Sequence, residues 1–259
     1  FSFYVGSILI MGFVNLILIS RIYKYLFKEK INFIFYLSIL IFIFINIFFY
    51  RIQEHGTDRS AQILIFLLII KLLLIINFDE GIRENIIKIL IILGLIISLK
   101  SFYLLYLALS FPVFYYFIKD KKFINILLIF KSYFFYFFLF LFINILFVNF
   151  ANSGCLIYPV SITCFDHFSW SIPLQEVSTM NDWYEQWSKA GANPNFRVEN
   201  PQEYIQYFNW VSNWFGEYFF TKVSDFLFGI LLLTLIFLLM FRSKQKKPLF
   251  IFKGEKFIY

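Results

Sequence analysis

The residues best suited to chemistry cluster in the short segment 51–60, which interrupts two long apolar runs. Its ionisable side chains are Arg51, Glu54, His55, Asp58 and Arg59. The two carboxylates and the imidazole offer a general base or a set of metal ligands, and the two guanidinium groups suit anion binding. An ordinary hairpin loop explains the same residues if Asp58 caps the following helix and Arg59 extends to the lipid headgroups. Both interpretations stay open.

A second group of candidates lies in the hydrophilic segment 151–222. It holds every tryptophan of the chain, namely Trp170, Trp183, Trp187, Trp210 and Trp214, together with several acidic residues. Aromatic faces beside carboxylates are typical of a carbohydrate groove, and aromatics also serve as anchors at the membrane interface. The anchor interpretation suits the last two tryptophans, close to an apolar run, whereas Trp170, Trp183 and Trp187 are expected in a packed core or on a ligand surface. For substrate binding we select Trp183, Glu185, Trp187 and Arg197.

The chain has two cysteines, Cys155 and Cys164, close together in this segment. A disulfide between them is favoured over two free thiols if the segment faces an oxidising compartment. The spacing does not resemble a zinc site, and no further cysteine could complete one. We therefore predict no structural metal, although a divalent ion at a catalytic site stays compatible with the sequence.

Three lysines lie in or between apolar runs. Lys71 and Lys131 fall inside predicted spans, where a charge is costly and indicates function unless the side chain reaches the surface. That alternative suits Lys131 better than Lys71. Lys100 lies at the tip of a short apolar hairpin and could meet a lipid phosphate. Sequence motifs of ATPases, zincins and α/β-hydrolases are absent.

The elements that must position these groups are membrane helices. The composition is 61% hydrophobic, with a mean hydropathy of +0.76, and apolar runs of about 18 residues are typical of spans. We predict an all-α, polytopic bundle of about seven spans and one extracytoplasmic, mostly helical loop domain. The spans are expected near 1–20, 32–50, 61–77, 86–99, 102–118, 123–150 and 223–241. The fourth and fifth are short for a full crossing.

Basic residues fix the expected orientation. Alternate loops, beginning with 21–31, carry more than twice as many lysines and arginines as the loops on the other side. Such loops face the cytoplasm, so the segment 51–60, the turn at Lys100 and the segment 151–222 should face outward. The net charge of +7 has the same origin, and nucleic acid is not an expected partner.

These patterns divide the chain into three parts. Residues 1–150 form a transmembrane bundle of about six spans, residues 151–222 an extracytoplasmic lid, and residues 223–259 the last span with a basic cytoplasmic tail. Inside the lid, one helix is expected from Asn181 to Lys189, ending near Gly191, and another from Pro201 into the last span, with Asn200 as its cap. The chain begins at Phe1 and ends in a mixed apolar and basic stretch, so we expect a piece of a longer polytopic protein.

Three stretches carry a resemblance to a known group. Residues 54–60 (EHGTDRS), 154–164 (GCLIYPVSITC) and 183–191 (WYEQWSKAG) resemble poorly characterised bacterial polytopic membrane proteins, which in turn look like integral-membrane glycosyltransferases of the GT-C class. Such enzymes use a lipid-linked phosphosugar and an acidic base on an outward loop. The resemblance implies an enzyme of the bacterial inner membrane in envelope polysaccharide or glycan synthesis.

Carried onto this chain, the resemblance makes Asp58 or Glu54 the base, with His55 beside them. Arg51, Arg59 and Lys100 would neutralise the leaving lipid phosphate, and the lid would close over the acceptor. The expected partners are the lipid bilayer, a polyprenyl-phosphate sugar donor and a glycan acceptor. The alternative is a transporter or flippase component without catalytic activity.

Overall fold

The protein is almost entirely helical in the computed structural model, which describes residues 2–27, 32–49, 57–78, 82–119, 127 and 129–240. The predicted all-α class is therefore confirmed for this part of the chain. The residues group by their mutual contacts into two compact units, and the second unit runs from Leu146 to Leu238. Each unit is described by itself.

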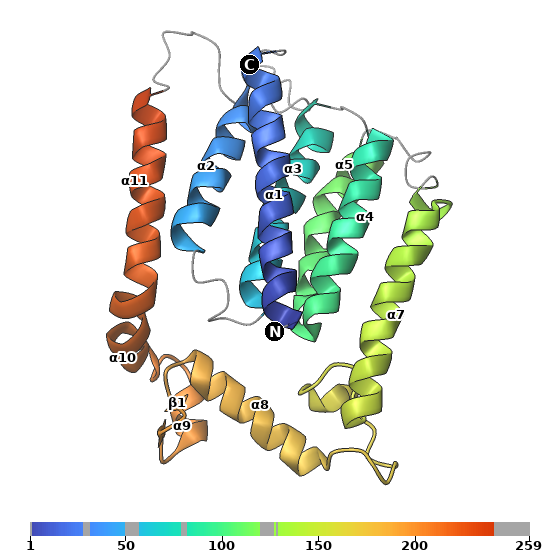
Figure 1. Cartoon of the computed structure of the whole chain (residues 1–259). Coiled ribbons are helices and arrows are strands. Elements are labelled where there is room, and N and C mark those ends of the chain that lie inside the picture. Colours follow the sequence, from blue (N-terminus) through green and yellow to red (C-terminus); the bar gives the residue numbers. More distant parts are fainter. Residues whose placement is uncertain are drawn as a thin grey trace. The chain divides into compact units, whose positions relative to one another are not determined.

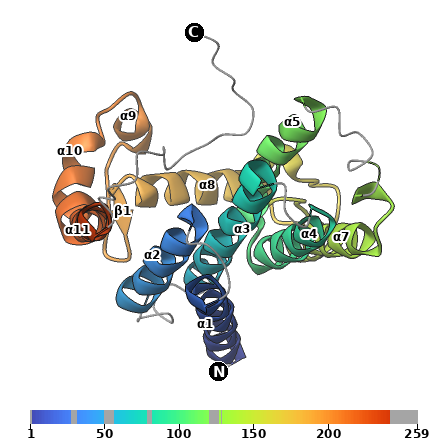
Figure 2. The same ribbon diagram turned by 90° about the horizontal axis from the view of Figure 1, so that it is seen from above.

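The first unit is a bundle of apolar helices. They are α1 (Ser2–Phe27), α2 (Phe33–Phe48), α3 (Asp58–Phe78), α4 (Ile82–Leu99), the 3₁₀ helix η1 (Ser101–Ser110), α5 (Phe111–Lys119) and most of α7 (Tyr133–Ser153). Helices α1 to α4 alternate in direction, and α3 lies between α2 and α4 (Figures 1 and 2). Helix α3 contacts α1, α2, α4 and α5, which makes it the central helix of the bundle.

The burial pattern of these helices is that of a protein in lipid. The core side chains of α3 include Ile63, Leu68, Ile70 and Ile75, all fully buried. In contrast, α1 and α7 expose many large apolar side chains, such as Phe13 and Phe140. Exposed apolar surface of this extent is unfavourable in water and is favourable in contact with lipid tails.

In the part of the chain that the structure describes, four helical segments are long and apolar enough to cross a bilayer. They are Val5–Phe27, Asp58–Ile76, Phe102–Lys119 and Tyr133–Ser153, with shorter apolar helices at Phe33–Phe48 and Phe226–Leu235. The chain is therefore a membrane protein with several apolar helices. The count of seven crossings stays a prediction.

The hairpin that the sequence predicted to be short is longer in the structure. Its second arm begins with the ten residues of η1 and continues through α5. A 3₁₀ helix rises by about 2.0 Å per residue against about 1.5 Å in an α-helix. The two segments together therefore extend over roughly 33 Å, enough for a hydrocarbon core of about 30 Å. The 3₁₀ geometry supplies the missing length.

The second unit packs short elements around helix α8. It contains the 3₁₀ turn η2 (Ser161–Thr163), α8 (Leu174–Ser188), the two-stranded ribbon β1 (Ala192–Asn193) and β2 (Phe196–Arg197), α9 (Pro201–Ile205), α10 (Val211–Trp214), the π-helix η3 (Phe215–Val223) and α11 (Ser224–Met240). The ribbon pairs Ala192 with Arg197 and Asn193 with Phe196.

The predicted helix from Pro201 into the last span is wrong. Helix α9 does begin at Pro201, directly after Asn200, although the Asn200 side chain makes no capping bond. The helix ends at Ile205, and Tyr207 follows with a left-handed φ of 52°. A left-handed residue cannot continue an α-helix. The rest of the predicted helix corresponds to α10, η3 and α11 in the structure. The periodicity of the sequence did not distinguish these segments from α9.

The sequence predicted the end of α8 correctly. It misplaced the start of the helix, and it indicated a glycine where the left-handed residue after the helix is an alanine. The helix begins at Leu174, well before the predicted Asn181. At its end, Gly191 N donates to Gln186 O at 2.7 Å and Ala190 N donates to Trp187 O at 3.2 Å. These two bonds define a Schellman motif, whose left-handed position is usually glycine. Here that position is Ala190, with φ 60°.

Candidate functional site

Three polar side chains meet at one end of the first unit. Asp58 is the first residue of α3, and Lys100 is the extended residue between α4 and η1. Lys100 Nζ lies 3.3 Å from Asp58 Oδ1. The Tyr103 hydroxyl donates a hydrogen bond to the same oxygen. The site thus joins two segments more than forty residues apart.

The local helix geometry explains why Lys100 and Tyr103 act together. Tyr103 N donates to Lys100 O at 3.0 Å, which is the i to i+3 bond of the 3₁₀ turn that opens η1. In a 3₁₀ helix the side chains at i and i+3 lie on one side. Tyr103 is buried and stacks on Tyr106 with ring centroids 5.7 Å apart. Packing therefore fixes the hydroxyl toward Asp58.

The Asp58 carboxylate retains a second oxygen for chemistry. Lys100 and Tyr103 both reach Oδ1, and no other described residue donates to Oδ2. The side chains of Lys100 and Asp58 are 54% and 43% exposed, so solvent or a ligand can reach both. The site thus presents a half-exposed carboxylate beside an exposed cation.

Arg59, the next residue, contacts side chains of its own helix and of the segment after α2. Its Nη1 donates to Gln62 Oε1 at 3.3 Å, and its guanidinium carbon lies 4.6 Å from the centre of the Phe49 ring. The following Ser60 is buried and donates to Ser7 Oγ of α1 at 2.9 Å. These contacts hold the first turn of α3 against its neighbours and so hold Asp58. The other predicted residues of this loop, Arg51, Glu54 and His55, lie outside the described residues.

The predicted substrate-binding residues of the second unit gather on α8 and the ribbon. The Trp183 and Trp187 rings are 4.8 Å apart and inclined by 56°. Arg197 Nε donates to Oε1 of the fully buried Gln186 at 2.9 Å. Gln186 Nε2 is buried and finds no partner in the described part of the chain. The two tryptophans are half-buried, so they present only part of their faces.

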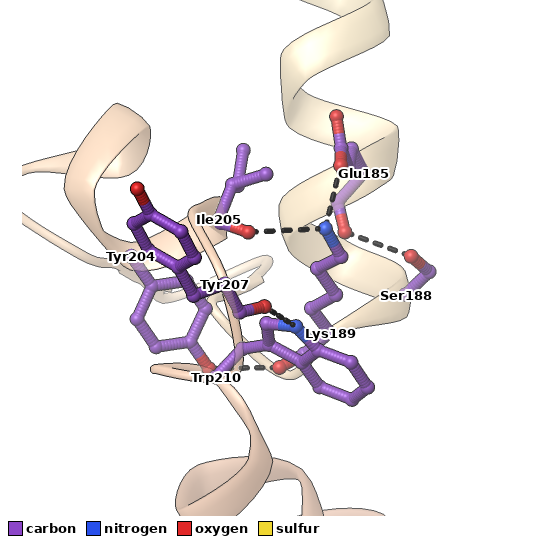
Figure 3. A network of polar contacts seen from close by, with 7 residues as sticks. All are labelled: Glu185, Ser188, Lys189, Tyr204, Ile205, Tyr207 and Trp210. Carbon is purple, nitrogen blue, oxygen red and sulfur yellow. Dashed lines mark hydrogen bonds and ion pairs between the residues drawn. The ribbon is translucent and has the colours of Figure 1, made fainter.

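Glu185 belongs to a network around Lys189 (Figure 3). Lys189 Nζ lies 2.6 Å from Glu185 Oε1, donates to Ile205 O at 3.4 Å, and stands 5.7 Å from the centre of the Trp210 ring. The Trp210 indole in turn donates to Tyr207 O at 3.1 Å. Glu185 Oε1 is therefore engaged in an ion pair, although the side chain is 40% exposed, and Lys189 ties α8 to α9.

Two tyrosines complete this packing. The Tyr204 hydroxyl donates to Lys189 O at 2.7 Å, and the Tyr218 hydroxyl donates to Trp187 O at 3.0 Å. Burial raises the pKa of both Tyr204 and Tyr218. Both hydroxyls therefore remain protonated, and donors to the end of α8, up to a higher pH than an ordinary tyrosine. Sequence reasoning did not single out either of them.

The two cysteines form a disulfide, the pairing that the sequence favoured. The Cα atoms of Cys155 and Cys164 are 3.8 Å apart. The bridge is reinforced by Leu156 N, which donates to Thr163 O at 3.0 Å, and by Phe165 N, which donates to Gly154 O at 2.9 Å. The segment that follows the bridge packs on the end of α7, where the Phe150 ring meets Phe168 and Trp170 edge to face.

In the described ranges, no three His, Cys, Asp or Glu side chains come close enough together to hold a metal ion. Glu54 and His55 are not among these ranges, so the metal-ligand interpretation of their loop stays a prediction.

Comparison with known protein families gives a match over almost the whole chain. The profile of a family described as a domain of unknown function, DUF8201, matches residues 1–258. The chain belongs to this family. No curated protein and no solved structure matches it.

Proposed function

We propose that this DUF8201 protein is an integral-membrane glycosyltransferase that transfers a sugar from a polyprenyl-phosphate carrier to a glycan acceptor. The observation that carries the proposal is the half-exposed Asp58 carboxylate, held by Lys100 and Tyr103 at a helix end. Sugar transfer from a lipid phosphate needs a base for the acceptor hydroxyl and a cation for the leaving phosphate. Asp58 and Lys100 are such a pair.

The proposed step uses both oxygens of Asp58. The acceptor hydroxyl gives its proton to Oδ2 while its oxygen bonds to the anomeric carbon of the sugar. The bond between that carbon and the phosphate oxygen breaks, and the electron pair leaves with the polyprenyl phosphate. Lys100, at 3.3 Å from Oδ1, balances the charge that develops on the phosphate. Arg51 and Arg59 are proposed to add to this anion-binding surface, and Glu54 and His55 to assist the proton transfer.

The proposal includes an orientation. The Asp58 end of the first unit faces the outside of a bacterial inner membrane, and so does the lid 151–222. The support is the excess of basic residues in the alternate loops. In the lid, the Trp183 and Trp187 faces are proposed to stack on sugar rings of the acceptor, and the exposed side of Arg197 to bind its hydroxyls.

A second candidate function is that of a transporter or flippase component, and one observation supports it. Lys71 is buried, only 6% exposed, within a helix long enough to cross the bilayer. Charged residues inside such helices commonly mark substrate or ion pathways. This candidate predicts movement of a lipid-linked sugar between leaflets without breakage of its phosphate bond.

The experiment that separates the two uses the full chain in nanodiscs with a panel of polyprenyl-phosphate sugars and candidate glycan acceptors. A transferase releases polyprenyl phosphate in step with glycosylated acceptor, and both products are measured by mass spectrometry. If no donor of the panel yields either product while the chain moves labelled donor between leaflets of a vesicle, the transporter takes precedence and the transferase is abandoned.

A further inference from the structure

The disulfide-closed hairpin 155–164 presents apolar side chains that no described part of the protein covers. No charged residue occurs in the hairpin. At its tip Ile162 is 91% exposed and Val160 is 39% exposed, and Leu156 near its base is 38% exposed. Helix α8 contacts the hairpin at η2, yet these side chains stay open. An apolar tip held outward by a covalent bridge is unfavourable in water and indicates an apolar partner.

The hairpin folds back beside the last turns of α7 (Figure 1). Asn149 Nδ2 donates to Leu156 O at 3.2 Å. Because Asn149 precedes the last residue of α7, Ser153, by four positions, this contact lies roughly 6 Å back along the helix. On the neighbouring positions of α7, Phe147 is 64% exposed and Val148 is 43% exposed, in a helix long and apolar enough to cross a bilayer. The apolar surface of the hairpin therefore continues a lipid-facing surface of α7.

The backbone of the hairpin suits a layer with little water. Leu156 N donates to Thr163 O at 3.0 Å, and Val160 N donates to Ile157 O at 2.8 Å. The Thr163 hydroxyl accepts from Ile157 N at 3.1 Å and donates to Val160 O at 2.8 Å. Pro159 has no N–H group to satisfy. Backbone groups in lipid must find their partners inside the protein, and the hairpin and the end of α7 supply partners for most of the N–H groups of the hairpin.

The residues after the bridge indicate where this apolar layer ends. The Phe168 and Trp170 rings stack with centroids 5.2 Å apart, and both side chains are half-exposed beside Phe150 of α7. Half-exposed aromatic side chains next to a span are typical of the membrane interface. The side chains of Asp166 and His167 are 49% and 86% exposed, which suits headgroups or water. Apolar, aromatic and charged groups thus follow one another as they do across the surface of a bilayer.

We propose that the hairpin 155–164 inserts its apolar tip into the lipid leaflet at this end of α7 and so anchors the lid to the membrane surface. The partner is the boundary between headgroups and acyl chains, which apolar faces of interfacial segments enter by about 5–10 Å. The contact roughly 6 Å back along α7 places the hairpin in this range. Because α8 contacts η2, the anchor also holds α8 near the membrane. The inference is independent of the chemistry proposed for Asp58.

The test is made on the full chain in phosphatidylcholine nanodiscs, with the photoreactive amino acid p-benzoylphenylalanine at one position at a time. This group inserts into C–H bonds on irradiation and introduces no thiol beside the bridge. It replaces Ile162 at the tip, Phe147 as the reference for lipid, and His167 as the matched control. The control is apt because His167 is nearly as exposed as Ile162 but polar. Mass spectrometry of the intact chain measures the yield of lipid adducts.

Lipid adducts are expected at position 162 in a yield close to that at 147, and in a several-fold lower yield at 167. Val160→Asp places a charge in the tip, which is unfavourable in lipid. It should remove most adducts at 162 and leave those at 147, which report that the chain is still inserted. Equal yields at 162 and 167 overturn the proposal, as does an unchanged yield at 162 in Val160→Asp. A cross-link from 162 to protein in place of lipid, whether to the same chain or to a second copy, also overturns it.

Discussion

The end of helix α8 offers a sharp test of the packing, because two adjacent residues should respond oppositely to exchange between alanine and glycine. Ala190 occupies the left-handed position of the Schellman motif, with φ 60°. Gly191 has an ordinary φ, but a Cβ on it would lie 2.8 Å from Tyr204 Cδ1 and overlap the Tyr204 ring further along its edge. Ala190 therefore holds a strained backbone conformation. At Gly191 the backbone is unstrained, and the only obstacle to a larger residue is the Tyr204 ring.

The magnitudes follow from these two facts. A left-handed alanine costs about 1–2 kcal/mol, and the greater freedom of glycine in the unfolded chain cancels about 0.5–1 kcal/mol of the gain. Ala190→Gly should thus stabilise the second unit by about 0.5–1 kcal/mol. Gly191→Ala should destabilise it by about 1–3 kcal/mol, because the Tyr204 ring must move and its 2.7 Å bond to Lys189 O must lengthen.

Intrinsic fluorescence is the natural assay, because every tryptophan of the chain lies in the second unit. Denaturant titration of the full chain in neutral detergent, followed at the tryptophan emission, gives the free energy of unfolding of that unit alone. The reasoning is refuted if Ala190→Gly lowers this free energy or if Gly191→Ala leaves it unchanged.

Two further predictions concern the second unit. Replacing Cys155 and Cys164 with serine opens a loop of ten residues and should cost about 2–3 kcal/mol of unfolding free energy; an equal stability of the reduced and oxidised wild type in the same titration would contradict this. Because burial raises the Tyr204 pKa, its contribution is full below the ordinary tyrosine pKa of about 10 and is lost as pH rises above it. Tyr204→Phe should cost about 1 kcal/mol at pH 8 and show a flatter decline to pH 11, whereas parallel declines would count against the bond to Lys189.

Part of the site could be predicted from the sequence because charge bias sorts loops between the two membrane faces. That bias assigned Asp58 and the turn at Lys100 to the same side, and the structure joins them by an ion pair. Tyr103 was missed because a tyrosine among leucines and phenylalanines looks like an interfacial residue. Its role depends on the 3₁₀ register of η1, which apolar periodicity does not encode.

The lid shows the same limit. The break after α9 rests on Tyr207, which adopts a left-handed conformation that sequence patterns assign to glycine or asparagine. Likewise Gly191 marked the end of α8 correctly, but the left-handed residue is Ala190 and the glycine serves the approach of Tyr204. Local sequence indicated where the chain must turn. Tertiary contacts decided which residue carries the turn.

The central claim is that Asp58 accepts the proton of the acceptor hydroxyl, and the rate of polyprenyl-phosphate release under single-turnover conditions tests it most directly. Asp58→Asn keeps the shape of the side chain and removes the base, so the rate should fall by about 10²–10⁴-fold. Asp58→Glu should retain part of the activity, and Asp166→Asn, which alters an exposed aspartate of the lid, should match wild type. A rate for Asp58→Asn within a few-fold of wild type would contradict the account.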